Sequence, residues 1–69
     1  MKTMTDKVIS NQMAIMLVKN YRKSRMLTQQ ELADQLSVNR TAVTKWELGQ
    51  QQVPAWVITT MYPKLDKYS

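Results

Sequence analysis

The sequence predicts an all-α protein built from four helices. Its 69 residues include only one Gly and two Pro, and the β-branched residues never alternate with polar ones over the length of a strand. Apolar residues recur instead at helical spacing, and capping residues mark the expected helix ends. The chain contains no repeat and no linker, so we expect a single domain over residues 1–69, with a polar tail over 64–69.

The first predicted helix begins near Thr5 or Asp6 and ends at Arg25, with Thr3 or Thr5 as its N-cap. Four apolar or aromatic residues recur on one side of the helical wheel. They are Ala14, Leu17, Val18 and Tyr21. We expect this side to pack in the core.

A second apolar stripe on the same helix is displaced from the core side by about 110°. Its members are Ile9, Met13 and Met16. We expect the last helix and the tail to cover it, through Trp56, Met61 and Tyr62. Contact with a second copy of the chain is the alternative.

The second predicted helix extends from Gln29 to Leu36. Thr28 and Glu31, three residues apart, form a capping box in which each side chain satisfies the backbone N–H of the other. The apolar side carries Leu32, Ala33 and Leu36. A short connection over residues 37–38 follows.

Capping residues and prolines also mark the ends of the last two predicted helices. Asn39 can cap a helix from Arg40 to about Leu48, and Gly49 suits the left-handed conformation at its C-terminus. A polar loop then leads to a proline in the first turn of a helix over about Ala55–Met61, which Pro63 ends.

The amino-acid composition restricts the classes of function that the chain can have. Ten Lys and Arg against five Asp and Glu give a net charge of +5, which favours a polyanionic partner such as nucleic acid or an anionic membrane. The absence of Cys and His argues against an enzyme, a metal site or a cofactor. The longest apolar run, Met13 to Val18, is far shorter than the roughly 20 residues that span a bilayer, and the first ten residues do not support a secretory signal. We therefore expect a cytoplasmic protein that does not enter membranes.

The third predicted helix has two distinct sides. A helical wheel groups Arg40, Thr41, Thr44, Lys45 and Leu48, and places Ala42, Val43, Trp46 and Glu47 opposite. Two cations and two hydroxyls on one side can reach base edges in a major groove, which is wide enough for a helix. Taken alone, however, the helix could equally be an amphipathic one that exposes its charged side to water.

The helices before it favour the first interpretation. The stretch LTQQELADQLSVNRTAVTKWELG, residues 27–49, closely resembles the helix-turn-helix of the phage repressor and Cro family of bacterial regulators. The resemblance extends over about Val18 to Met61, with the helix-turn-helix itself at about 28–48. It implies a small, shortened lambda-repressor-like domain that binds DNA.

Two features depart from the family pattern. Ser37 stands where the family usually has a left-handed Gly, a conformation that costs a non-glycine residue roughly 1 kcal/mol or more. The family also usually continues into a fifth helix, for which Pro63 and the polar tail leave no room.

The resemblance also implies roles for individual residues. The positions that contact bases in the family are occupied by Arg40, Thr41, Thr44 and Lys45. Gln29 matches a phosphate-contacting position, Asn39 combines capping with a backbone contact, and Gln50 begins a loop of three Gln near the next phosphates. Gln29 could instead be a plain first-turn residue, and the loop could simply be solvated. Arg22 and Glu47 match a structural salt bridge.

The expected function is therefore transcriptional regulation by a Cro-like phage or prophage repressor in a bacterial host. A restriction-system controller or an antitoxin-like autoregulator would look nearly identical. An antirepressor that sequesters a partner repressor is the alternative from another class, and a membrane-surface helix would not explain the capping box. Besides operator DNA, we expect a second copy as partner, in a weak homodimer strengthened on DNA. The candidate contacts are Trp56, Val57, Met61, Ile9, Met13 and Met16.

Overall fold

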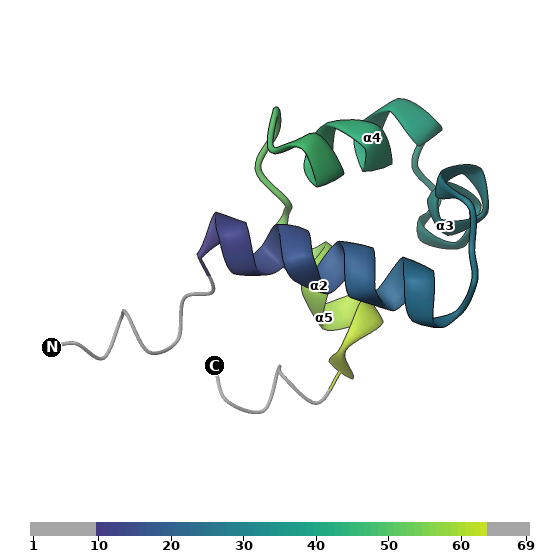
Figure 1. Ribbon diagram of the computed structural model, residues 1–69, viewed down its shortest axis with the longest axis horizontal. Helices are drawn as coiled ribbons and strands as arrows, with labels where there is room; N and C mark the ends of the chain where they lie inside the picture. Colours follow the sequence, from purple (N-terminus) through teal and green to yellow (C-terminus); the bar gives the residue numbers. More distant parts are fainter. Residues whose placement is uncertain (1–9, 64–69) are drawn as a thin grey trace, which may run out of the picture.

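The computed structural model describes residues 10–63, and these residues form helices and connecting loops without any strand. The helices are α2 (Asn11–Ser24), α3 (Gln29–Leu36), α4 (Arg40–Leu48) and α5 (Ala55–Met61). α3 packs against α4, whereas α2 packs against both α4 and α5. In Figure 1, α4 lies above α2 and α5 extends below it. The all-helical prediction is confirmed, and the bounds predicted for α3, α4 and α5 agree with the structure.

The predicted start of the first helix is wrong. Ser10 has an extended backbone, with φ −61° and ψ 155°, and its Oγ accepts a hydrogen bond from the N–H of Met13 at 3.2 Å. Ser10 is therefore the N-cap, and α2 begins at Asn11. At the other end α2 stops at Ser24, with Arg25 as its C-cap. The other predicted caps, Ile9 of the second stripe, and the tail over 64–69 lie outside the described residues.

Side-chain caps fix the first turns of α3 and α4. The capping box is present: the N–H of Glu31 donates to Thr28 Oγ1 at 3.0 Å, and the N–H of Thr28 donates to Glu31 Oε1 at 2.8 Å. Asn39 Oδ1 accepts from the N–H of Ala42 at 3.1 Å. These caps fix where α3 and α4 begin, and therefore which of their side chains face the core.

Left-handed residues end both helices. Ser37 has φ 59° and Gly49 has φ 76°, and in each turn the next N–H returns to the preceding helix, from Val38 to Ala33 O and from Gln50 to Lys45 O, both at 2.9 Å. The left-handed conformation expected for Ser37 is confirmed. Met26, at φ 56°, is a second non-glycine residue in this region and was not predicted.

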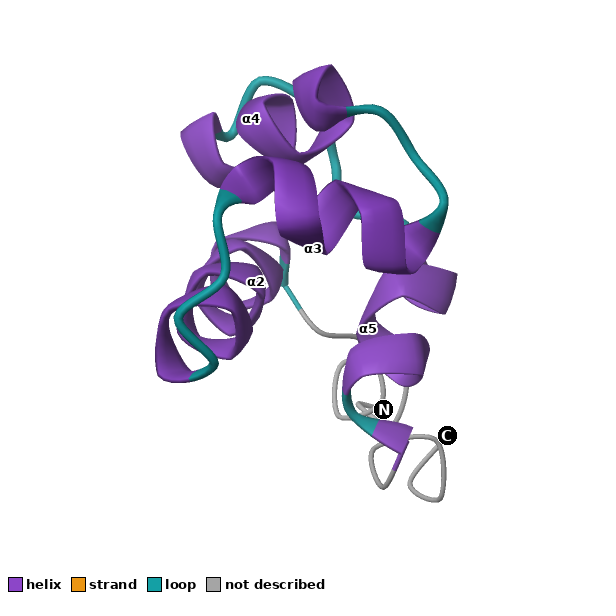
Figure 2. Ribbon diagram, turned by 90° about the vertical axis from the view of Figure 1, so that its right-hand side faces the viewer, coloured by secondary structure: helices purple, strands orange, loops and turns teal. Residues whose placement is uncertain are grey.

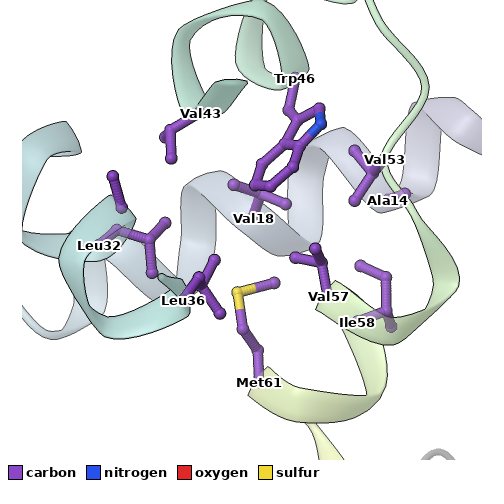
Figure 3. Close-up of a cluster of buried hydrophobic side chains, with 11 residues drawn as sticks. Ala14, Val18, Leu32, Leu36, Val43, Trp46, Val53, Val57, Ile58 and Met61 are labelled. Atoms are coloured by element: carbon purple, nitrogen blue, oxygen red, sulfur yellow. The ribbon is translucent and has the colours of Figure 1, made fainter. Parts of the chain in front are cut away.

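All four helices contribute to one hydrophobic core. Val18 of α2, Leu32 of α3, Val43 of α4 and Val57 of α5 are fully buried, and Figure 3 shows the side chains of the cluster converging between the helices. The other buried members are Ala14, Ala33, Leu36, Trp46, Val53, Ile58 and Met61. The predicted core side of α2 is confirmed, because its remaining members, Leu17 and Tyr21, pack against the cluster.

The expected burial of the second stripe is wrong for its described members. Met13 is 54% exposed and Met16 is 61% exposed. α5 packs on the core side of α2 instead, with Val57 and Met61 buried in the core of the protomer itself. These two side chains are therefore not available to a second copy, which corrects their assignment as dimer contacts. Trp56 remains 48% exposed.

Candidate nucleic-acid interface

The two sides of α4 lie in different environments. Val43 and Trp46 are almost completely buried, as is Glu47 at 8% exposure. On the other side, the side chains of Arg40 and Lys45 are exposed. Thr41 is also exposed there, and Thr44 is partly buried. α4 is therefore anchored by its apolar side and presents two cations and a hydroxyl to the surroundings.

An ion pair joins α2 to α4. Arg22 Nε donates to Glu47 Oε2 at 2.7 Å, and Arg22 Nη2 donates to Glu47 Oε1 at 3.0 Å. The third nitrogen, Nη1, donates to the carbonyl oxygen of Leu27 at 3.1 Å, in the connection between α2 and α3. This bidentate arrangement fixes the planes of both groups. The salt bridge implied by the family resemblance is thus present in the structure.

The pair is ionised because its hydrogen bonds outweigh its burial. Burial raises the pKa of Glu47, but the hydrogen bonds from Arg22 and Gln29, with the positive charges of Arg22 and Lys19, lower the pKa of this carboxyl below its ordinary value. The hydrogen bond to Glu47 raises the pKa of the Arg22 guanidinium against the smaller effect of its own desolvation. Glu47 is therefore a carboxylate at neutral pH.

The side chain of Gln29 extends this network to the start of α3. Its Nε2 donates to Glu47 Oε1 at 3.2 Å, and its Oε1 accepts from the hydroxyl of Thr44 at 2.8 Å. The first residue of α3 is therefore tied to two successive turns of α4. Figure 2 shows α3 and α4 as adjacent helices joined by a short loop, the arrangement that brings these side chains together.

The structure places the remaining predicted site residues around this network. Arg40 Nη1 lies 3.5 Å from Thr44 Oγ1, at the edge of the network. Asn39 uses its Oδ1 to cap α4, and Gln50 is exposed in the loop that follows. Gln29, Arg40 and Thr44 are thus linked through Thr44 Oγ1, whereas Asn39 and Gln50 lie at opposite ends of α4.

One feature of this surface was not predicted. The bonds from Gln29 to Thr44 and Glu47 connect residues far apart in the sequence, and helical periodicity within one element carries no information about them. Leu48 is 65% exposed at the C-terminal end of α4, on the side where the helical wheel placed it.

A protein-family model described as helix-turn-helix matches residues 18–55, more than half of the chain. The chain belongs to this helix-turn-helix family. The family is found in Cro-like and repressor-like regulators and binds double-stranded DNA, so the predicted resemblance is confirmed. The match spans α3, α4 and the turn between them, which are the elements that carry the network and the exposed cations of this helix-turn-helix protein.

Comparisons of this helix-turn-helix protein with curated proteins and with solved structures gave no match. Over residues 10–63, none of the helices has the length and apolar character needed to cross a membrane.

Proposed function

We propose that this protein is a Cro-like repressor of phage or prophage origin that binds operator DNA sequence-specifically in the cytoplasm of a bacterial host. The observation that supports this most directly is the asymmetry of α4. Val43 and Trp46 hold the helix in the core, while Arg40, Thr41 and Lys45 project outward with no apolar cover. A rigidly held helix with exposed cations suits insertion into a major groove.

Base contacts are assigned to the exposed side of α4. The guanidinium of Arg40 and the ammonium of Lys45 suit the O6 and N7 acceptors of guanine, and the methyl group of Thr41 suits the methyl group of thymine. Thr44 lies on the same side, but its hydroxyl is bonded to Gln29, so the base contacts are assigned to Arg40, Thr41 and Lys45.

Phosphate contacts are assigned to the ends of the two helices. Gln29 opens α3, where free backbone N–H groups and the helix dipole favour an anion. Asn39 and Gln50 flank α4 at its two ends, near the phosphates on either side of the groove. These contacts fix the position of α4 on the duplex without selecting a sequence.

Recognition of one site in a genome requires a second copy, because a single helix contacts only a few base pairs. Two-fold pairing would place two α4 helices in successive major grooves about 34 Å apart, so the operator should be a pseudo-palindrome. The exposed side chains available for pairing are Trp56, Met13 and Met16. We expect a weak homodimer, completed on DNA by mass action.

A binding-site selection from randomised duplex DNA tests the base contacts. Wild-type protein should enrich one motif, and Arg40→Ala and Lys45→Ala should each weaken binding to it by roughly 1 to 3 kcal/mol and relax preference at separate positions. Lys23→Ala is the matched control, because it removes the same charge from an exposed position on α2. Variants of Arg40 and Lys45 that select the wild-type motif would refute the assignment.

Titration of the protein onto the selected palindrome and onto a single half-site tests the dimer. Two protomers per palindrome, bound more tightly than the half-site, are expected. One protomer per palindrome, or equal affinity for both DNAs, would refute the dimer.

A second candidate function is that of an antirepressor that binds a partner repressor. The exposed methionines of α2, Met13 and Met16, favour it, because a flexible apolar stripe suits a protein partner. The same selection separates the two functions: an antirepressor would enrich no DNA motif, and changing Met13 and Met16 to Gln would abolish its activity.

A further inference from the structure

The hydroxyl group of Thr44 is occupied inside the protein. Its single hydrogen is donated to Gln29 Oε1 at 2.8 Å, the shortest of the contacts between these side chains of α3 and α4. A hydroxyl has one hydrogen to donate, so in this arrangement Thr44 cannot also donate to a base. Thr44 is partly buried, unlike its exposed neighbours Thr41 and Lys45 on the same side of α4.

The bond from Thr44 also fixes which way the amide of Gln29 points. The carboxylate of Glu47 only accepts hydrogen bonds, so the NH₂ group of Gln29 must face it, at 3.2 Å from Nε2 to Oε1. The carbonyl oxygen of Gln29 then faces the Thr44 hydroxyl. A flipped amide would place its oxygen against the carboxylate, and this repulsion selects a single orientation.

One N–H of this amide has no acceptor among residues 10–63. Of the two hydrogens on Gln29 Nε2, one is donated to Glu47, and the other is available at a partly exposed residue that opens α3. Gln29 is also the first residue of α3, where backbone N–H groups that the capping box leaves free can serve the same anion.

We propose that Thr44 is a positioning residue, whose hydroxyl holds the Gln29 amide so that its free N–H donates to a DNA phosphate, and that this hydroxyl contacts no base. The inference rests on the proposed DNA binding. It separates the roles of four residues that share one side of α4: Arg40, Thr41 and Lys45 contact bases directly, whereas Thr44 acts through Gln29. Thr44 therefore controls the affinity for all DNA sequences and not the preference among them.

The variant that isolates the hydroxyl is Thr44→Val, which keeps the shape and one methyl group of the side chain. Thr44→Ser restores the hydroxyl without the methyl group. Thr41→Val is the matched control for the measurement on free protein, because it makes the same chemical change at an exposed residue of α4.

The first measurement uses free protein. Side-chain amide NMR relaxation should show the NH₂ group of Gln29 as ordered in wild type, in Thr44→Ser and in Thr41→Val, and as mobile in Thr44→Val. An equally ordered Gln29 amide in Thr44→Val would overturn the proposal, since the hydroxyl would then not hold it.

The second measurement compares DNA binding by wild type, Thr44→Val and Thr44→Ser. Thr44→Val should weaken binding to every sequence alike, on the order of 3- to 10-fold for the loss of one well-placed hydrogen bond, and should leave the selected motif unchanged. Thr44→Ser should restore affinity. In a Gln29→Ala background, Thr44→Val should cause no further loss, because its effect passes through the amide.

Three outcomes of the binding measurement would overturn the proposal. They are a changed base preference in Thr44→Val, an affinity loss that adds fully to that of Gln29→Ala, and an unchanged affinity despite a mobile amide. Wild-type protein that enriched no DNA motif would refute the proposed function separately, and the NMR measurement would still decide whether Thr44 holds Gln29.

Discussion

Replacement of Glu47 by Ala tests the connection between α2 and α4 most severely. Glu47 is almost completely buried and accepts three hydrogen bonds, two from Arg22 and one from Gln29. The substitution would leave the guanidinium without its counter-charge in a site where its side chain is only 18% exposed. Breaking a fully buried pair costs about 3 to 5 kcal/mol.

Two structural features place the expected cost below the top of that range. Arg22 keeps its bond to the carbonyl oxygen of Leu27, and its partial exposure allows water to replace some of the lost contacts. We therefore expect Glu47→Ala to lower the free energy of unfolding by about 2 to 4 kcal/mol. A domain of this size loses roughly 4 to 8 °C in Tm per kcal/mol, so the melting temperature should fall by about 10 to 30 °C.

Thermal unfolding followed by circular dichroism measures this change. Asp34→Ala is the charge-matched control, since Asp34 is exposed, and it should shift the free energy of unfolding by no more than about 0.5 kcal/mol. The double variant Arg22→Met with Glu47→Leu should recover most of the loss, because it removes the unpaired charge. A Glu47→Ala protein melting within a degree of wild type, or a double variant as unstable as the single one, would refute the reasoning.

Three further predictions concern backbone strain, pH and local capping. Ser37→Gly and Met26→Gly should each raise the free energy of unfolding in urea by about 0.5 to 1 kcal/mol, since both residues have positive φ; no gain would show that these turns are unstrained. The folded state lowers the pKa of Glu47, so its stabilisation is present above the unfolded value of about 4.3 and is lost as pH falls through the lower folded value. The stability difference between wild type and Glu47→Gln should therefore shrink from pH 7 to pH 3, and a constant difference would contradict the shift. Thr28→Ala should cost about 1 kcal/mol through loss of the capping box, whereas an unchanged urea midpoint would show that the box adds nothing.

Local sequence signals were sufficient for the helix-turn-helix itself. Thr28 with Glu31, Asn39 and Gly49 each satisfy backbone groups within a few residues, so the ends of α3 and α4 depend little on the rest of the fold. The sequence determined the start of α2 less precisely, because several hydroxyl residues precede it and the apolar periodicity continues through Ser10. The structure selects Ser10 because its hydroxyl bonds to the N–H of Met13.

Tertiary arrangement was less accessible from the sequence. The wheel identified both apolar sides of the first helix, but it carried no information on which one α5 would cover. α5 packs against the side with Ala14 and Val18, so Met13 and Met16 stay exposed. The network of Gln29 was likewise hidden, since its two partners on α4 lie 15 and 18 residues away in the sequence.

Arg22 and Gln29 share the carboxylate of Glu47, so single variants of each can distinguish effects on folding stability from effects on DNA affinity. Its Oε1 accepts both from Arg22, which ties α2 to α4, and from Gln29, which ties α3 to α4. Removing Arg22 should therefore disturb both connections and lower stability and DNA affinity together. Removing Gln29 leaves the ion pair intact, so Gln29→Ala should melt close to wild type while it binds all DNA sequences more weakly. Because the buried charge pair stabilises the fold and the proposed phosphate contact belongs to the amide, Gln29 is the partner of Glu47 that can be varied to tune affinity without a large loss of stability.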